Sequence, residues 1–396
     1  MEGERFLYLG RAPWASIWRR RQQLLSRIAS QRNMVLYVDP PTSLSTFRQS
    51  PEERINLTQR HFGLRKEAEN LFVYSPVYPF PLNRVELFNR LNRQLLVGRL
   101  KAIQRKLGLE RPVLFLNHTF DAHHFFGCFG ERLTCYDCTD NYYAYKPIGP
   151  EDTDRYWRNE RLLASRANLV FVVSEELHRI YSSINPNTYL VPNGADFSGY
   201  ARAALQETPI SKDMADIKHP VLGFVGELKE KIDLELIEQI AISRPEWSVA
   251  LIGPVVPLEF DLRRFKDRPN VHYLGKKPVS LLPNYLRAID VCLLPLRESE
   301  YNKSVDPLKL YEYLATGKPV VSTNVAPVRR FEELVYVAKD RTEFVRKVEQ
   351  ALAEDSQELR HSRQRVAQEN SWDKRVEQIY QLVQAHLMAS SPKGQG

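Results

Sequence analysis

Residues 304–323 read SVDPLKLYEYLATGKPVVST, and this stretch contains the start and end signals of a helix followed by a strand. Asp306 is a candidate N-cap residue, and Pro307 suits the first helical position. Gly317 is typical of the residue that ends a helix, and the apolar residues 320–322 predict a strand. The stretch therefore predicts a helix–strand connection of a parallel sheet.

The same alternation extends through both halves of the chain. Short apolar runs bounded by turn residues alternate with segments of helical period, which is typical of parallel α/β architecture. The predicted strands are 6–9, 35–38, 71–73, 113–116, 134–136, 169–173 and 189–191, then 221–225, 249–252, 271–274, 291–294, 320–322 and 335–337. Helices are predicted near 231–243, 279–288, 307–316 and 341–353. We expect two doubly wound, Rossmann-like sheets.

A chain of 396 residues suits two cores better than one. The polar, strand-poor residues 198–219 predict a linker, so we expect one domain over 1–205 and a second over 216–370. A final amphipathic helix over 372–390 needs an apolar surface and is assigned to the first domain. Residues 391–396 are expected to form a disordered tail.

Composition excludes several classes of protein. With 43% hydrophobic and 26% charged residues, the chain is globular rather than disordered. No apolar run approaches the roughly 20 residues that span a bilayer, and no signal peptide is evident, so we expect a cytoplasmic protein. The four cysteines are too few for a disulfide framework. Cys135 and Cys138 have CxxC spacing without a second such pair, and buried thiols are expected.

The formal charge of +8 favours an anionic partner, either nucleotide diphosphates, phospholipid head groups or nucleic acid. Near the start, residues 18–28 place apolar side chains beside an arginine cluster that includes Arg21. This segment is either a solvated basic helix face or a contact for a diphosphate or a membrane surface. No nucleic-acid recognition motif is present, so nucleic acid is not expected.

Two side chains of the opening stretch suit a nucleotide. In an open parallel sheet, a helix that follows a strand begins at the carboxyl edge, where its free N–H groups favour anions. Lys309 lies in the predicted first turn and would add a positive charge for a diphosphate. Glu312 offers the two acceptors needed for a ribose diol. The alternative is that the two side chains simply pair with each other.

Residues 307–322, with DVCLLP at 290–295 before them, resemble the donor-binding half of GT-B glycosyltransferases, close to the retaining family-four (family 1-like) group. In that group an E-x-x-A helix followed by G-x-P-V-V holds the nucleotide ribose, and Glu312 falls on this glutamate. Other segments match in order, namely VSE at 173–175, YLVPNGAD at 189–196, GFVG at 223–226 and the final helix with Trp372. The resemblance implies two Rossmann-like domains facing across a cleft, with the crossover helix at the C-terminus.

The resemblance also implies the donor contacts, which are Gly226, Lys231, Ser304, Lys309, Leu310 and Glu312. Ser304 stands where the family's E-x7-E pattern has its first glutamate. Glu227 follows Gly226 where a basic residue is common in the family, so Lys229 or Lys231 would supply the charge for the diphosphate. The donor would be a nucleotide-sugar substrate, with no cofactor and no metal.

His118 and Asp140 are the expected catalytic residues, because each follows a predicted strand at the carboxyl edge and could position a hydroxyl or the donor sugar. The alternative is that they only order their loops. Further acceptor or cleft residues are expected at Gly10, Arg11, Arg21, Ser174, Asn193 and Asp196. Asp152-Thr153-Asp154 has the spelling of a metal-binding DxD motif but does not follow a strand, so a loop or a helix start is expected.

The sequence thus favours transfer of a sugar from a nucleotide-sugar to an acceptor hydroxyl in cell-envelope or exopolysaccharide synthesis. The acceptor would be a saccharide or lipid-linked, with peripheral contact on the inner face of the cell membrane. Two alternatives remain. One is a sugar-nucleotide 2-epimerase of the same fold, and the other is a degenerate, non-catalytic module that binds membranes or polyanions.

Overall fold

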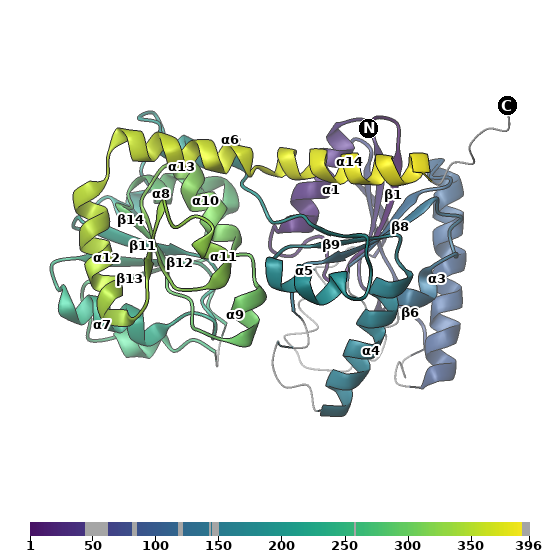
Figure 1. Cartoon of the computed structure of the whole chain (residues 1–396), viewed down its shortest axis with the longest axis horizontal. Helices are drawn as coiled ribbons and strands as arrows, with labels where there is room; N and C mark the ends of the chain where they lie inside the picture. The colour runs from purple at the N-terminus through teal and green to yellow at the C-terminus, as the bar shows by residue number, and fades with distance from the viewer. Residues whose placement is uncertain are drawn as a thin grey trace. The chain divides into compact units, whose positions relative to one another are not determined.

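The computed structural model describes residues 1–43, 62–80, 85–117, 122–141, 144, 150–256 and 259–389 (Figure 1). The chain forms two compact units. The first unit comprises Met1–Val191 and Val376–Gly396, and the second comprises Pro192–Arg375. Each unit has its own sheet, so the prediction of two Rossmann-like domains is confirmed.

The first unit is built on an eight-stranded sheet in the order β10-β9-β8-β7-β1-β2-β5-β4. All neighbours are parallel except β4, which runs antiparallel to β5. The strands are β1 (Arg5–Leu9), β2 (Met34–Val38), β4 (Gly63–Ala68), β5 (Leu71–Ser75), β7 (Val113–Leu116), β8 (Leu133–Cys138), β9 (Leu169–Val172) and β10 (Thr188–Leu190). A separate pair is formed by β3 (Thr42–Ser43) and β6 (Val77–Tyr78).

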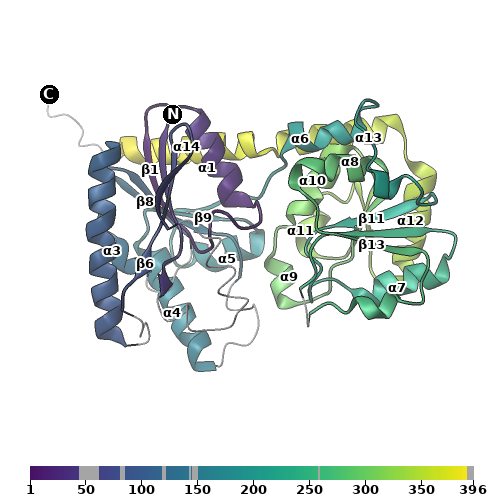
Figure 2. The ribbon, with the colours of Figure 1, turned by 180° about the vertical axis from the view of Figure 1, so that it is seen from behind.

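Helices cover both faces of this sheet (Figures 1 and 2). They are α1 (Arg20–Ser30), α3 (Glu86–Leu107), α4 (Pro150–Arg166), α5 (Glu175–Ser182) and the part of α14 (Trp372–Ala389) that follows Arg375, with a 3₁₀ turn at Ala122–Phe125. Because side chains alternate along a strand, Leu7 and Leu9 pack into the core that α3, α4 and α5 complete. Phe6 faces the other way and lies against Tyr380 of α14, with 6.2 Å between ring centres.

The second unit has a six-stranded parallel sheet in the order β13-β12-β11-β14-β15-β16. Its strands are β11 (Val221–Val225), β12 (Ser248–Ile252), β13 (Val271–Gly275), β14 (Val291–Leu294), β15 (Val320–Thr323) and β16 (Val335–Ala338). The helices are α6 (Phe197–Ala201), α7 (Leu234–Ser243), α8 (Leu282–Arg287), α9 (Glu300–Ser304), α10 (Leu308–Thr316), α11 (Ala326–Arg329), α12 (Arg341–Glu354) and α13 (Gln357–Glu369). Short 3₁₀ turns lie at Arg202–Ala204, Lys212–Met214, Leu262–Phe265 and Val279–Leu281.

The segment interpreted as a linker, residues 198–219, lies inside the second unit. It contains most of α6 and two 3₁₀ turns, and Tyr200, Ala203 and Met214 are buried in that unit's core. The chain passes between units at Val191 and Pro192, and again at Arg375 and Val376 within α14. The boundaries therefore differ from the expected 205 and 216, because several of the few apolar residues in this polar stretch pack into the second core, although Leu205 and Ile210 are exposed.

Among the described residues, no helix is both long enough and apolar enough to cross a membrane. The tail over residues 391–396, expected to be disordered, lies outside the described part of the chain.

Candidate donor and acceptor sites

The second sheet reverses its winding between β11 and β14, and such a switch point is where open α/β sheets bind ligands. Gly226 ends β11 there, and its N–H donates to the carbonyl of Ile252 at 2.8 Å. Gly253 follows β12 with φ at 147°, and a Cβ on Gly253 would overlap the carbonyl oxygen of Gly226. Glycine is therefore required at position 253 for the turns after β11 and β12 to approach each other this closely.

Helix α10 begins beside this turn, one residue later than predicted. Pro307 occupies the N-cap position, and no side chain caps the helix. The expectation that Asp306 caps α10 is therefore corrected, because its carboxylate points to other partners described below. Gly317 ends the helix in the left-handed conformation at φ 76°, as predicted.

Lys309 and Glu312 form an ion pair on α10, with 2.6 Å between Nζ and Oε2. The side chain of Glu312 is 8% exposed and that of Lys309 is 25% exposed. Gly226 lies close by, since a Cβ there would be 3.7 Å from Cε of Lys309. Tyr200 of α6 is hydrogen-bonded to Glu312, and burial followed by the Glu312 charge raises the pKa of Tyr200, so its hydroxyl remains a donor. The structure thus brings a cation, a carboxylate and a glycine turn together at the switch point.

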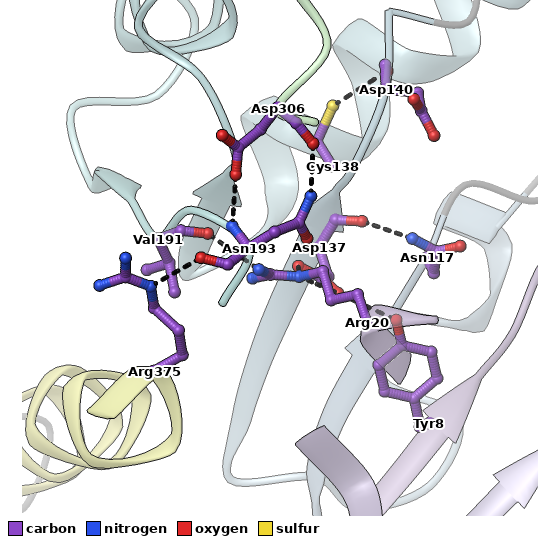
Figure 3. A network of polar contacts seen from close by, with 10 residues as sticks. All are labelled: Tyr8, Arg20, Asn117, Asp137, Cys138, Asp140, Val191, Asn193, Asp306 and Arg375. Carbon is purple, nitrogen blue, oxygen red and sulfur yellow. Dashed lines mark hydrogen bonds and ion pairs between the residues drawn. The ribbon is translucent and has the colours of Figure 1, made fainter. Parts of the chain in front are cut away.

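Asp306 belongs to a buried network that fixes the chain just before α10 (Figure 3). Its Oδ2 accepts from the N–H of Asn193 at 2.6 Å, and its Oδ1 accepts from the hydroxyl of Tyr311 at 2.9 Å and from Nη2 of Arg330 at 2.6 Å. Nε of Arg375 donates to the carbonyl of Asn193 at 3.1 Å. Burial raises the pKa of Asp306, and the Arg330 charge opposes this rise. Asn193, expected in the cleft, is therefore an anchor for the loop that precedes α10.

The other residues predicted to contact the donor lie in different surroundings from one another. Ser304 is fully buried, and its hydroxyl lies 3.0 Å from the carbonyl oxygen of Tyr301 within α9. Its side chain therefore points into the protein interior. The side chain of Leu310 lies in the core of the second unit. Lys231 is half-buried, and its carbonyl accepts from the N–H of Arg297 at 2.9 Å. Lys229, the other candidate for the diphosphate charge, is paired with Glu227 at 3.1 Å.

In the first sheet the winding reverses between β1 and β7. Gly10 ends β1, and a Cβ there would overlap the hydroxyl of Tyr37, so only glycine fits. Asn117 ends β7 and its Nδ2 donates to the carbonyl of Asp137 at 2.7 Å, which joins the ends of β7 and β8. Asp140, half-buried, follows β8 at the same edge, as predicted. His118 lies outside the described residues.

A buried polar cluster that the sequence analysis missed lies beneath this edge (Figure 3). The carboxylate of Asp137 accepts from Nε of Arg20 at 3.1 Å and from the hydroxyl of Tyr8 at 3.0 Å. Arg20 also donates from Nη1 to the carbonyl of Val191 at 2.9 Å. Burial, with the Asp137 charge next, raises the pKa of Tyr8 and keeps its hydroxyl a donor. Arg20, Leu24 and Ile28 recur at helical spacing on the inner face of α1, and this periodicity is the signal that could have placed Arg20 inside.

Other expected cleft residues have local roles. Ser174 caps α5, where its hydroxyl accepts from the N–H of Leu177 at 3.4 Å. Arg21 donates to the carbonyl of Pro13 at 3.0 Å and to the hydroxyl of Ser16, so it orders the turn before α1. Arg11 is exposed, and Asp196 occupies the N-cap position of α6 without a cap bond from its side chain.

The structure also places the two motifs whose sequences resemble a metal-binding motif and a redox motif. Residues 152–154 lie in the first turns of α4, as expected for a helix start. Cys135 and Cys138 both lie in β8, are buried and form no disulfide, and burial raises the pKa of both thiols well above its usual value. The CxxC spelling therefore marks two core thiols.

Part of this chain matches known proteins in sequence. Residues 219–354 match the family model described as Glycosyl transferases group 1. TuaH of Bacillus subtilis (strain 168), whose name describes a teichuronic acid biosynthesis glycosyltransferase, is 28% identical over 270 residues. The match covers 63% of this chain and 67% of TuaH.

Solved structures match it in fold over nearly its whole length. Sucrose-phosphate synthase from Thermosynechococcus elongatus has a TM-score of 0.71 at 16% identity, over 98% of this chain and 100% of that chain. HepE of Anabaena, solved in complex with UDP and glucose, has a TM-score of 0.63 at 16% identity, over 98% and 100% of the two chains. The chain therefore has the two-domain GT-B fold of these structures, and its residues 219–354 are similar to the family described as Glycosyl transferases group 1.

Proposed function

We propose that this protein transfers the sugar of a UDP-sugar to an acceptor hydroxyl during synthesis of a cell-envelope polysaccharide. The name of TuaH supports the polysaccharide, and the complexes of HepE with UDP and with UDP-glucose support the base. The observation that carries the proposal is the Lys309–Glu312 pair at the switch point, beside the glycine turn at Gly226.

Each member of the pair has a separate task when the nucleotide binds. The Glu312 carboxylate accepts from the ribose diol, and the Lys309 ammonium turns to the diphosphate, which also lies at the first turn of α10. When the bond between the sugar and the diphosphate breaks, negative charge grows on the leaving oxygen. A cation already held there stabilises that charge more than it stabilises the bound donor, which lowers the barrier.

Fewer residues support the proposed acceptor site. Asp140, at the carboxyl edge of the first sheet, is our candidate for orienting the acceptor hydroxyl, and His118 remains a second candidate. We propose a saccharide or lipid-linked acceptor and a site of action at the cytoplasmic face of the membrane. The net charge of +8 on residues 1–191 suits an acceptor that carries phosphate.

Calorimetric titration with UDP, GDP and their common sugar conjugates tests the donor assignment. We expect UDP to bind and expect Lys309→Ala and Glu312→Ala each to lower its affinity at least about tenfold, or 1.4 kcal/mol. Lys303→Ala is a matched control, because Lys303 forms an exposed pair with Glu300 at the same spacing on α9. Absence of nucleotide binding at millimolar UDP would leave the non-catalytic module, and an epimerised sugar without transfer would establish the 2-epimerase.

A further inference from the structure

Helix α3 has apolar side chains on two opposite faces. Leu96 and Leu100 lie on the inner face and are buried in the core of the first unit. Leu87, Leu91 and Leu95 recur four residues apart on the outer face. Leu87 is 63% exposed, Leu95 is 43% exposed and Leu91 is half-buried. A helix that covers a core ordinarily has polar residues outside, so the outer leucines are not explained by folding of this unit.

Basic side chains border the outer leucines. On a helical projection, Arg90 and Lys101 lie on one side of the leucine row and Arg99 and Lys106 on the other, and all four are exposed. Helix α3 contains six Lys or Arg residues and one acidic residue, Glu86. Basic residues on both sides of an exposed apolar row match the phosphate plane of an anionic bilayer.

The distribution of charge along the chain agrees with this position. Residues 1–191 contain 27 Lys or Arg and 19 Asp or Glu, a net charge of +8. Residues 192–375 contain 28 of each and are neutral. The positive charge of the protein therefore belongs to the first unit, and α3 contributes +5 of it.

The arginines of α1, the segment that the sequence suggested for a membrane contact, are used differently. Arg20 is buried against Asp137, Arg21 binds the turn at Pro13, and Arg27 donates to Gln23 of its own helix. Their guanidinium groups are directed to partners within the protein. On the outer face of α3, Arg99 reaches the carbonyl of Val77 at 3.5 Å, and all four basic side chains are exposed beside the leucine row.

We propose that the outer face of α3 binds an anionic phospholipid bilayer, with the helix in the plane of the surface. Leu87, Leu91 and Leu95 enter the boundary between head groups and acyl chains, and the flanking basic residues contact lipid phosphates. At 22 residues, α3 presents a surface about 33 Å long. This inference does not depend on the sugar donor, and its failure would leave the nucleotide site unaffected.

Sedimentation of the full chain with vesicles tests the proposal, using phosphatidylcholine alone or mixed with phosphatidylglycerol. We expect binding only to the mixed vesicles and weaker binding as salt rises. Arg90→Gln with Lys101→Gln should lower the partition coefficient about 25-fold, at about five-fold for each charge near the surface. Leu87→Ser with Leu95→Ser should lower it at least about tenfold.

Leu162→Ser is the matched control, because Leu162 is 45% exposed on α4, a helix with equal numbers of basic and acidic residues. It should bind vesicles as the unchanged protein does. All substituted side chains are exposed, and far-ultraviolet circular dichroism would verify that each variant is folded.

Three results would overturn the proposal. Binding that is unchanged in the leucine variant, with equal affinity for dextran sulfate, would assign the basic face to a soluble polyanion. Loss of a dimer in sedimentation velocity on leucine substitution would assign the outer face to a second copy of the chain. Equal binding to neutral vesicles would show that charge complementarity has no part in it.

Discussion

Removing the charge of Lys309 and removing the charge of Glu312 should lower local stability by different amounts. In Lys309→Met the Glu312 carboxylate stays buried, at 8% exposure, and keeps the hydroxyl of Tyr200 as a partner. In Glu312→Gln the ammonium of Lys309, already 25% exposed, can turn into water. The loss of stability therefore depends on how deeply the remaining charged side chain is buried. Lys309→Met should be the more destabilising of the two substitutions.

The magnitudes follow from the surroundings. An uncompensated buried charge costs about 3–5 kcal/mol, and a hydrogen bond to a charged group returns about 1.5–3 kcal/mol. We therefore expect Lys309→Met to cost about 2 kcal/mol and Glu312→Gln less than about 1 kcal/mol. In hydrogen exchange of the α10 amides, residues 308–316, about 2 kcal/mol corresponds to roughly 30-fold faster exchange.

The assay is mass-spectrometric hydrogen exchange with and without UDP. At a hundredfold excess over its dissociation constant, a nucleotide should add up to about 2.7 kcal/mol of protection to the unchanged protein and much less to either variant. Lys303→Met, whose exposed pair with Glu300 is worth little, should exchange normally. If Glu312→Gln accelerates exchange as much as Lys309→Met, the burial argument is wrong.

Two further predictions concern Arg20, which is buried, and His272, which is half-buried. Arg20→Met should destabilise the first unit by about 3–5 kcal/mol in urea unfolding, because it leaves Asp137 charged at 1% exposure. Burial lowers the pKa of His272 below 6.5, so the folded state loses this proton before the unfolded state does. Stability should therefore rise with pH up to about 6.5 and level off above it, and His272→Gln should remove this contribution.

Each of these has a decisive companion measurement. The double variant Arg20→Met, Asp137→Leu should recover part of the lost stability, since no charge is then left unpaired, and a further loss would contradict the reasoning. For His272, urea titrations at several pH values in both proteins compare the slopes. Identical slopes below about pH 6.5 would assign the pH dependence to other groups.

The region around α10 was the most predictable part of the chain, because its signals are local. Pro307 and Gly317 determine where a helix can begin and end, and the observed bounds differ from the prediction by one residue. The edge strand β4 was missed since its sequence, GLRKEA, is polar and shows no apolar alternation. Its place depends on pairing with β5, which is a property of the folded sheet.

The roles of single polar side chains were harder to predict because their partners are distant in sequence. Asp306 matches an N-cap by local spacing, yet its strongest contacts are to Asn193 and Arg330. Ser304 matches a family position by alignment, yet its hydroxyl faces carbonyls of its own short helix. In each case the local sequence was compatible both with the predicted role and with the observed contact. Tertiary packing determined which of the two formed.

The burial of three of the four cysteines allows unfolding to be measured by thiol labelling. Cys135, Cys138 and Cys292 are buried, and burial raises the pKa of each thiol, so alkylating reagents meet neither an accessible atom nor a thiolate. Cys128 alone is partly exposed among them. With Cys128 replaced by serine, a brief pulse of maleimide would count unfolded molecules, and one added surface cysteine would accept a fluorophore at a single chosen place.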